Sequence, residues 1–364
     1  MKALVLKAPG ELEVKDVPAP EIGQGDLLVR VMACGICGSD VHGLDGSTGR
    51  RIPPLVMGHE AAGVVERVGA GVAAFAPGDR VTFDSTIYNP ESFFSRRGLP
   101  NLCDERRVLG VSCADYRRDG AFAELVAVPS HIAYHLPPGI SFEQAAMVEP
   151  LAIAAHARRL AVLEAGDTAL VMGTGLIGLM TVQVIRQTPG VRIVAADVED
   201  DRLALARELG AHEVINSRAD DVVAVVRALT GGRGADVAFE AAGIEATVRG
   251  AILAVRKGGS VTLIGNLAPD VSFPLQAVVT RQIRVQGSCA SSGEYPGCLE
   301  LIASGKVNVD RFISAAGPLE EGPLWFDRLR RKERGLLKVL LKPNPPHSSA
   351  RLMVSCFTPP RLAQ

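Results

Sequence analysis

Three residue types that zinc accepts as ligands occur close together near the start of the chain. Cys37 belongs to the segment CGICGSDVH at 34–42, and His59 and Glu60 follow it after 21 intervening residues. A catalytic zinc uses three protein ligands drawn from thiolate, imidazole and carboxylate, and it keeps one position open for water or substrate. We therefore predict a catalytic zinc site formed by Cys37, His59 and Glu60.

Other interpretations of this segment stay open at this point. Cys34 and Cys37 form a CxxC pair, which is also typical of redox sites, and both thiols could be buried structural groups. A zinc protease is excluded, because the segment HEAAG at 59–63 lacks the second His of the protease helix.

A glycine-rich turn provides a second candidate site. The segment GTGLIG at 173–178 follows an apolar segment that favours a strand and opens one that favours a helix. Gly173 would make the tight turn, Gly175 would let the backbone approach a pyrophosphate, and Gly178 would let the helix pack on the sheet. Leu176 and Ile177 would present the free N–H groups of the helix N-terminus to the phosphates. These features predict a dinucleotide cofactor.

Asp197 ends the next predicted strand, 19 residues after Gly178. An acidic residue at this place accepts hydrogen bonds from the adenosine ribose. The three acidic residues at 199–201 would repel the additional phosphate of NADP, and no Arg directly follows Asp197 to neutralise it. The sequence therefore favours NAD. Arg202 is a candidate contact for the adenine, with an ordinary helix-surface Arg as the alternative.

Strand and helix signals alternate regularly from about residue 165 onward. Apolar segments typical of buried strands lie at 169–172, 192–196, 212–215, 235–240, 260–264 and 283–285. Strands separated by helices need crossover connections, so we predict a parallel sheet with helices on both faces, a doubly wound α/β domain. The uncharged segment 168–185 contains the glycine turn and is therefore a strand plus a helix, not a membrane span.

The first 150 residues have a different pattern. Short β-prone segments at 3–6, 27–31, 61–68 and 80–83 are separated by Pro and Gly, which predicts a mainly β domain with long loops. The last apolar segment, 336–341, could return to pair with this domain. The Pro-rich segment 344–364 is expected to be a mobile or loosely docked tail.

Composition and charge exclude several classes of partner. The 364 residues contain 39 Lys and Arg against 40 Asp and Glu, so the net charge of −1 attracts neither nucleic acid nor an anionic membrane. The basic residues at 328–334 alternate with acidic ones, which is typical of a solvated helix face. Seven dispersed cysteines and a charged N-terminal segment lead us to expect a cytoplasmic protein.

Together these motifs resemble the zinc-dependent medium-chain dehydrogenase/reductase family. Their order is CGICGSDVH, then GHE at 58–60 with Gly63, then GDRV at 78–81, then Glu149-Pro150, then GTGLIG. The resemblance is closest to the polyol branch, which includes sorbitol (iditol), galactitol-phosphate and threonine dehydrogenases. It implies a GroES-like catalytic domain at 1–151 and 288–343, an NAD-binding Rossmann domain at 152–287, and a tail at 344–364.

The resemblance also assigns roles around the metal. It implies that Cys37, His59 and Glu60 are zinc ligands, and that Glu149 binds zinc directly or through water. Asp40 matches a residue that orients His59 by a hydrogen bond.

For the reaction, the resemblance implies transfer of hydride from a secondary alcohol, such as a polyol or a derivative, to NAD. Ser39 and His42 match a relay that carries the alcohol proton to solvent. Cys34 matches no ligand and is expected to be a small buried residue. The family also implies a homo-oligomer, either a dimer or a tetramer, with a small-molecule substrate and no nucleic-acid or membrane partner.

Two segments depart from the family pattern. Many relatives hold a structural zinc with four cysteines, whereas the matching positions here are Asn89, Ser92, Ser95 and Cys103, so we predict a single zinc per chain. Packing of Tyr88, Phe93 and Phe94 would then have to hold this loop. Sorbitol dehydrogenases carry an Arg-Tyr pair where this chain has SCAS at 288–291, which argues against sorbitol itself.

Two other functions remain as alternatives. A zinc-free quinone or enone reductase of the same fold would need no Cys, His and Glu set and would commonly use NADPH. A non-catalytic NAD-binding sensor would need neither the zinc ligands nor the relay.

Overall fold

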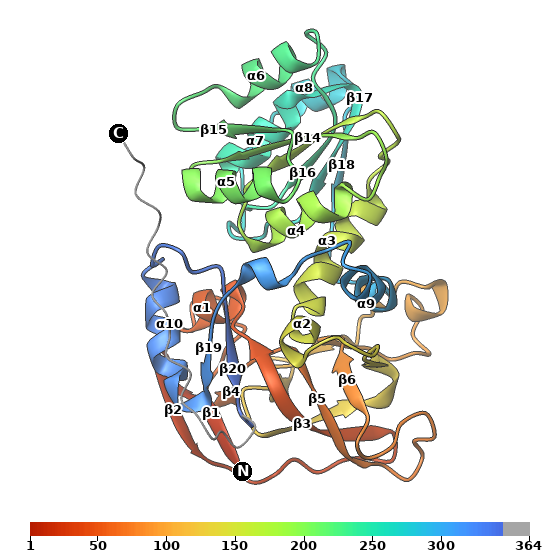
Figure 1. Ribbon diagram of the computed structural model, residues 1–364, viewed down its shortest axis with the longest axis vertical. Coiled ribbons are helices and arrows are strands. Elements are labelled where there is room, and N and C mark those ends of the chain that lie inside the picture. Colours follow the sequence, from red (N-terminus) through yellow and green to blue (C-terminus); the bar gives the residue numbers. More distant parts are fainter. Residues whose placement is uncertain (345–364) are drawn as a thin grey trace.

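The apolar segments of the second half form a six-stranded parallel sheet, the upper part of the computed structural model in Figure 1, which describes residues 1–344. The strand order is β15-β14-β13-β16-β17-β18, so the chain reverses direction across the sheet between β13 and β16. The strands are β13 (Thr168–Met172), β14 (Arg192–Asp197), β15 (Glu213–Asn216), β16 (Ala235–Glu240), β17 (Val255–Leu263) and β18 (Arg284–Gly287). In such a sheet, ligands bind at the carboxyl ends of the strands where the order reverses.

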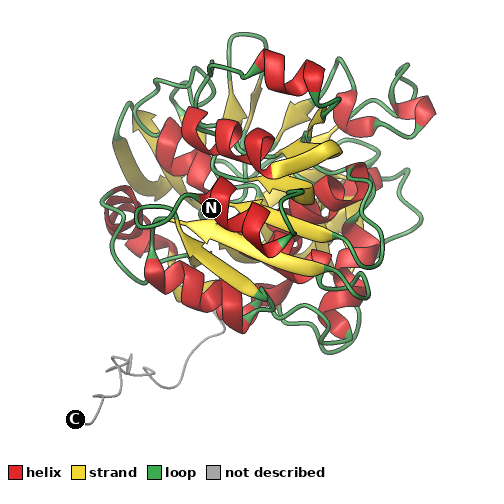
Figure 2. Ribbon diagram, turned by 90° about the horizontal axis from the view of Figure 1, so that it is seen from above, coloured by secondary structure: helices red, strands yellow, loops and turns green. Residues whose placement is uncertain are grey.

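The predicted doubly wound arrangement is confirmed. Helices lie on both faces of this sheet (Figures 1 and 2), and two separate apolar clusters pack against it. The helices are α4 (Leu176–Ile185), α5 (Asp200–Glu208), α6 (Val222–Leu229), α7 (Glu245–Ala254) and α8 (Leu275–Thr280). The prediction at 260–264 began too late, because β17 starts at Val255 and continues through the segment RKGGS at 256–260, which has no apolar signal.

The uncharged segment 168–185 divides between β13 and α4, as predicted. Across residues 1–344, the helices are all too short or too polar to cross a membrane.

The first half forms a mainly β domain, the lower part of Figure 1. Its largest sheet has the order β12-β6-β5-β3-β20-β19, with β11 also paired to β3. A second sheet has the order β2-β1-β4. The strands are β1 (Lys2–Ala8), β2 (Glu11–Asp16), β3 (Asp26–Gly35), β4 (Leu55–Val56), β5 (Glu60–Val68), β6 (Arg80–Phe83), β7 (Thr86–Ile87), β8 (Arg107–Val108), β9 (Val111–Ser112), β10 (Arg117–Arg118), β11 (Leu125–Pro129), β12 (Ala133–His135), β19 (Ile313–Pro318) and β20 (Lys338–Lys342).

Strand β20 returns to the N-terminal domain, as the segment 336–341 predicted. It pairs antiparallel with β3, with Leu340 opposite Gly35 and Leu341 opposite Cys34. The Asn344 side chain then donates hydrogen bonds to the carbonyls of Val31 (3.0 Å) and Glu124 (2.9 Å). The rest of the expected tail, 345–364, lies outside the described residues.

Helices connect the two sheets. α2 (Phe142–Ala146) and α3 (Val148–Leu160) run from the β domain to the parallel sheet, and α3 packs against α4 and α9 (Tyr295–Ala303) (Figure 1). α1 (Gly38–Gly43) follows β3, and α10 (Gly322–Arg330) precedes β20. Apolar side chains of α2, α3, α9 and the parallel sheet share one buried cluster, so the two sheets are joined through a common core.

Candidate active site

The backbone pairing of β3 and β5 brings the predicted metal ligands together. Gly35 at the end of β3 is the register partner of Glu60 at the start of β5. Cys37 follows as the N-cap of α1, and His59 immediately precedes β5. One donor atom from each of Cys37, His59 and Glu60 lies within 4.8 Å of the other two. Two segments far apart in the chain thus converge on one point.

The chemistry of these three side chains fits zinc. Thiolate, imidazole and carboxylate are the ligands that catalytic zinc sites combine. Burial raises the pKa of the Cys37 thiol to about 12, so a nearby cation is needed to keep the sulfur as a thiolate. His59 is 6 % exposed, and within the described residues its Nδ1 has no hydrogen-bond partner. A buried polar group of this kind is costly unless something binds it.

Glu149 adjoins the metal ligands from the first turn of α3. Burial raises the pKa of its carboxyl to about 8, His59 opposes that rise, and the charges of Glu60 and Cys37 add to it. Its Oε1 accepts a hydrogen bond of 3.0 Å from Ser85 Oγ. Its oxygens lie outside the 4.8 Å group, which contains Cys37, His59 and Glu60 alone among the described residues.

Lys338 is a further residue of this site that the sequence analysis did not predict. Its Nζ lies 2.5 Å from Glu60 Oε2 and 2.9 Å from the carbonyl of Ile36, and the side chain is 2 % exposed. Burial alone would lower the pKa of Lys338, but the charges of Glu60 and Cys37 outweigh it and raise that pKa. The sequence contains one signal for it: Lys338 is the single charged residue of the apolar segment LLKVLL at 336–341. A Lys that is buried with such a segment needs a negatively charged or polar partner.

Asp40 lies on α1 and is fully buried. Its Oδ2 accepts a hydrogen bond from the Cys37 N–H at 3.2 Å, and its Oδ1 accepts one from Arg51 Nη2 at 2.8 Å. His59 Nδ1 lies 3.6 Å from the same Oδ1, which is beyond hydrogen-bond range. The expected hydrogen bond between Asp40 and His59 is therefore not formed, because Arg51 occupies that oxygen.

Ser39 and His42 lie on α1 with their side chains exposed. The Ser39 hydroxyl lies close enough to the sulfur of Cys37 to favour a lower pKa of that thiol, against the larger effect of burial. The helix that begins after Cys37 thus carries both relay candidates.

The glycine-rich turn has the geometry of a phosphate-binding loop. Gly173 has φ +90°, and a Cβ on Gly178 would lie 1.8 Å from the carbonyl oxygen of Gly173, so neither position accepts another residue without rearrangement. Gly175 is the N-cap of α4, and a Cβ there would meet nothing within 4 Å. Open space therefore lies beside Gly175, where α4 begins with Leu176 and Ile177, and the N-terminus of a helix is a place that favours an anion.

Asp197 ends β14 beside this turn and is 8 % exposed. Its carboxylate accepts three backbone hydrogen bonds, from Thr174 at 2.6 Å, Val198 at 2.7 Å and Glu199 at 3.0 Å. A carboxylate offers about four lone pairs, so roughly one remains for a ribose hydroxyl. Arg202 is half-buried in the first turn of α5.

The acidic residues that follow Asp197 are paired with positive or polar groups. Glu199 forms a 2.7 Å ion pair with Arg218, and Asp201 forms one with Arg334 at 2.5 Å. The Asp200 side chain accepts a hydrogen bond from Asn216 at 2.7 Å. Their repulsion of an NADP phosphate is therefore weaker than the sequence alone suggested.

Packing and hydrogen bonds both hold the loop at 89–103, and Tyr88, which precedes it, packs against the core of the β domain. Ser92 Oγ donates to Ser95 Oγ at 2.8 Å, and Cys103 is buried. Phe93 was expected to anchor this loop, but it is 60 % exposed, and its ring contacts Phe94 and the Arg97 guanidinium. In the part of the chain that the structure describes, no metal-binding group forms at this loop.

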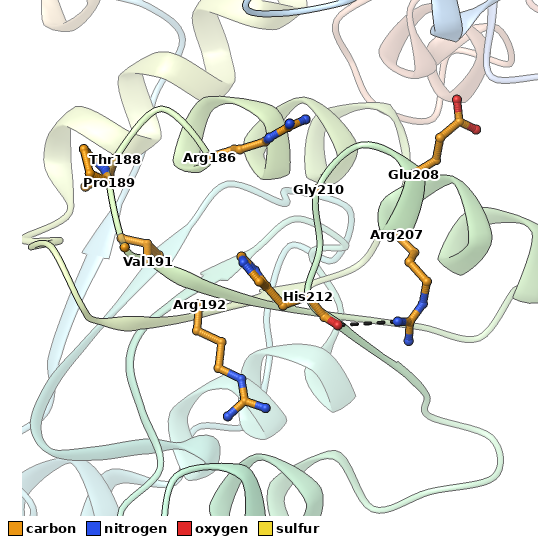
Figure 3. A pocket seen from close by; sticks show the side chains of 10 residues that line it. Arg186, Thr188, Pro189, Val191, Arg192, Arg207, Glu208, Gly210 and His212 are labelled. Carbon is orange, nitrogen blue, oxygen red and sulfur yellow. Dashed lines mark hydrogen bonds between the residues drawn. The ribbon is translucent and has the colours of Figure 1, made fainter.

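A cavity of about 550 Å³ lies elsewhere, at the amino ends of β14 and β15. Figure 3 shows that the Arg186 and Arg192 side chains beside it point in different directions. Arg192 is paired with Glu213 at 3.0 Å. This cavity lies at the amino ends of the strands, whereas the glycine-rich turn follows the carboxyl end of β13. Cys37, His59 and Glu60 do not line it.

The fold and the donor set define a dehydrogenase with a zinc site and a nucleotide-binding sheet. Residues 23–138 match the family model described as alcohol dehydrogenase GroES-like domain, and residues 177–304 match that of zinc-binding dehydrogenase. Sorbitol dehydrogenase of Bacillus subtilis is 32 % identical over 349 residues, which is 94 % of this chain and 98 % of that protein. D-arabitol-phosphate dehydrogenase of Enterococcus avium is 33 % identical, over 95 % of this chain and 98 % of its own length.

A solved structure gives the same result. A protein of Sinorhizobium meliloti 1021, described as a zinc-binding dehydrogenase and bound to NADP, superposes with a TM-score of 0.85 at 34 % identity. The match covers 94 % of this chain and 99 % of that one. The chain belongs to the zinc-dependent medium-chain dehydrogenases, in their polyol dehydrogenase branch, and is an oxidoreductase.

Proposed function

We propose that this enzyme oxidises a secondary alcohol group of a polyol or polyol derivative, with one zinc per chain and NAD as the hydride acceptor. The observation that carries the proposal is the convergence of Cys37, His59 and Glu60 within 4.8 Å in a chain that also has the open turn at Gly175. The names of the relatives, which include sorbitol and D-arabitol-phosphate dehydrogenases, support a polyol or a polyol phosphate.

The residues around the proposed metal have different roles. Cys37, His59 and Glu60 would hold the metal, with Glu149 as an additional ligand or the partner of a bound water. Zinc, when bound, stabilises negative charge on a substrate oxygen and lowers the pKa of a hydroxyl group there. Lys338 keeps Glu60 in position and compensates its charge.

The overall change converts the alcohol and NAD⁺ into a ketone, NADH and one proton. Ser39 takes the proton of the substrate hydroxyl on its Oγ while its own hydroxyl proton passes outward, to a cofactor ribose hydroxyl or a water. His42, which is exposed at the end of α1, releases it to solvent. The nicotinamide of bound NAD would accept the hydride from the carbon that carries the substrate hydroxyl group.

NAD is the cofactor that Asp197 supports best. An additional phosphate carries a charge of about −1.5 to −2 and would lie against this carboxylate. The nearby pairs of Glu199 with Arg218 and Asp201 with Arg334 reduce the repulsion but leave the Asp197 charge without a cationic partner within the described residues. Binding of NADP by the S. meliloti relative makes the comparison of both cofactors part of the test.

The substrate is a polyol other than sorbitol. Ser291 Oγ, in the segment that carries an Arg-Tyr pair in sorbitol dehydrogenases, donates a 2.9 Å hydrogen bond to the buried Asp84. This segment thus offers small neutral groups instead of a guanidinium. We also propose that the enzyme works in the cytoplasm as a dimer or tetramer.

The decisive experiment is an absorbance screen for NADH formation with zinc-loaded protein. Polyols, polyol phosphates, threonine and simple secondary alcohols are each offered with NAD and with NADP. Turnover with a polyol that a zinc chelator abolishes supports the proposal. Reduction of quinones by chelator-treated protein with NADPH would support the zinc-free reductase instead, and NAD binding without turnover on any alcohol would support a sensor.

A further inference from the structure

Arg51 is a buried cation beside Ser39. Its side chain is 4 % exposed. The Nη2 atom donates to Asp40 Oδ1 at 2.8 Å and also to Ser39 Oγ at 3.3 Å, while Nε lies 3.3 Å from the same Asp40 oxygen. One guanidinium thus links Asp40, which accepts a hydrogen bond from the Cys37 N–H, with Ser39, the proposed proton acceptor. We propose that Arg51 is a positioning residue for Ser39, an inference that rests on the proposed function.

The chemistry of the two groups fixes the direction of the hydrogen bonds. A guanidinium only donates, so Ser39 Oγ must accept from Arg51 with one of its two lone pairs. The second lone pair stays available for the substrate proton, and the hydroxyl hydrogen stays available to be passed on. Arg51 therefore leaves Ser39 able to accept one proton and to donate another, as a relay requires. The contact also restricts the rotation of the Ser39 hydroxyl.

Ser39 needs such a constraint because its own surroundings give little. It is exposed on α1, a helix of 6 residues. An exposed serine samples several rotamers, and a displacement of about 1 Å in a reacting group costs about 10²-fold in rate. The contact to a charged, buried donor selects one of these rotamers.

The rest of the structure holds Arg51 rigidly in place. Its backbone forms a bridge with Ser112 at the end of β9, and Ile52 N donates to the Ser112 carbonyl at 3.0 Å. Nη1 donates to the carbonyl of Arg50 at 3.0 Å. A Cβ on Gly43 would lie 2.6 Å from Arg51 Cγ, so α1 leaves space for this side chain at Gly43.

A double-mutant cycle tests the proposal in zinc-loaded enzyme with its best substrate. Arg51→Lys keeps a positive charge for Asp40, but a single ammonium cannot reproduce the fork of contacts to Asp40 and Ser39. We expect Arg51→Lys to lower kcat by roughly 10-fold or more in the parent. In a Ser39→Ala background, where no hydroxyl remains to be positioned, it should change kcat by less than about twofold.

Three controls accompany the cycle. Arg50→Lys changes the exposed neighbour and should leave kcat unchanged. Zinc content by elemental analysis and the dissociation constant of NAD by fluorescence titration should be the same for parent and Arg51→Lys. If Arg51→Lys does not fold, Gly43→Ala replaces it, since the added methyl group displaces the Arg51 side chain without removing its charge.

The outcomes distinguish an error in the role of Arg51 from an error in the role of Ser39. An equal fall in kcat in the presence and in the absence of the Ser39 hydroxyl would show that Arg51 is merely structural and would overturn the inference while the relay stands. Loss of zinc from Arg51→Lys would overturn it in the same way. If Ser39→Ala alone turns over at the parent rate while chemistry limits turnover, the relay itself is wrong and the role of Arg51 is lost with it.

Discussion

Lys338 and Glu60 form a buried ion pair, with 2.5 Å between Nζ and Oε2, across a separation of 278 residues in the chain. Both side chains are almost completely buried, at 2 % and 1 % exposed. The pair connects β20, the last strand, with the strand that begins at the metal ligands. A buried charge that loses its only partner is much more costly than a surface charge.

The first prediction concerns this pair. Lys338→Met should lower the free energy of unfolding by about 3 to 5 kcal/mol, because it leaves the Glu60 carboxylate buried and unpaired. The matched control is Lys342→Met, which removes the partly exposed pair with Glu143 and should cost about 1 kcal/mol or less. Urea unfolding of zinc-free protein measures both. Equal losses in the two variants would mean that the Lys338 pair contributes no more than a surface pair.

Zinc stoichiometry gives a second prediction. Elemental analysis of metal-replete protein should find about one zinc per chain, because the loop at 89–103 offers hydroxyls and a single buried thiol, Cys103. A reproducible value near two would contradict this, provided that Cys103→Ser lowers it to one.

Loss of the metal and loss of the relay should have different effects. Cys37→Ser should remove bound zinc and nearly all turnover. Ser39→Ala should keep the zinc and slow alcohol oxidation by roughly 10²-fold, the lower range for a positioned proton-transfer group. His42→Ala should be milder, because water can replace an exposed relay member. Zinc content and turnover are measured together on the three variants, and a zinc-free Ser39→Ala protein would mean that Ser39 mainly supports the metal ligand.

Cofactor preference should depend on Asp197. Asp197→Ala should weaken NAD binding and narrow the ratio of kcat/KM for NAD over NADP, since it removes both a ribose acceptor and a negative charge beside the site of the additional phosphate. Asp200→Ala, whose side chain contacts Asn216, is the matched control and should change that ratio little. Steady-state kinetics with both cofactors decides, and equal use of NADP by the unmodified enzyme would contradict the preference for NAD.

Asp84 gives a prediction on pH. Burial raises the pKa of its carboxyl to about 6 from the ordinary value of 3.8, although hydrogen bonds from Thr86 and Ser291 oppose the rise. The folded state therefore holds this proton more tightly, and the parent loses stability as the pH rises from about 4 through 6. Asp84→Asn cannot titrate, so its free energy of unfolding relative to the parent should increase by about 2 kcal/mol between about pH 4.5 and pH 7.5.

Urea unfolding of both proteins across that range measures the effect. A constant difference between Asp84→Asn and the parent would show that the carboxyl titrates alike in the folded and unfolded chains.

Local signals made much of the fold predictable from the sequence. The glycines at 173, 175 and 178 and the regular alternation of apolar segments indicated the parallel sheet and its turn, because these features act within a few residues of each other. The proposed metal ligands Cys37, His59 and Glu60 were indicated by residue type, and the register of β3 with β5 explains why they meet.

The missed features depend on distant contacts. Arg51 and Lys338 act through partners on other elements, and a charged residue in the sequence does not show which partner it has. Phe93 was expected to be buried because it is aromatic, but the short loop around it has no core of its own. The hydrogen bond expected from His59 to Asp40 is not formed, because a third group, Arg51, donates to the same oxygen.

The position of β20 between β3 and β19 has a consequence for how the enzyme is made. At a synthesis rate of about 5 to 20 residues per second, the 278 residues between Glu60 and Lys338 take roughly 15 to 55 s to appear. During that interval Cys37, His59 and Glu60 already exist, while β3 lacks β20 and Glu60 lacks its counter-charge. The strands of the parallel sheet are all synthesised before Lys338, so that sheet can fold on the ribosome while the Glu60 carboxylate is still unpaired.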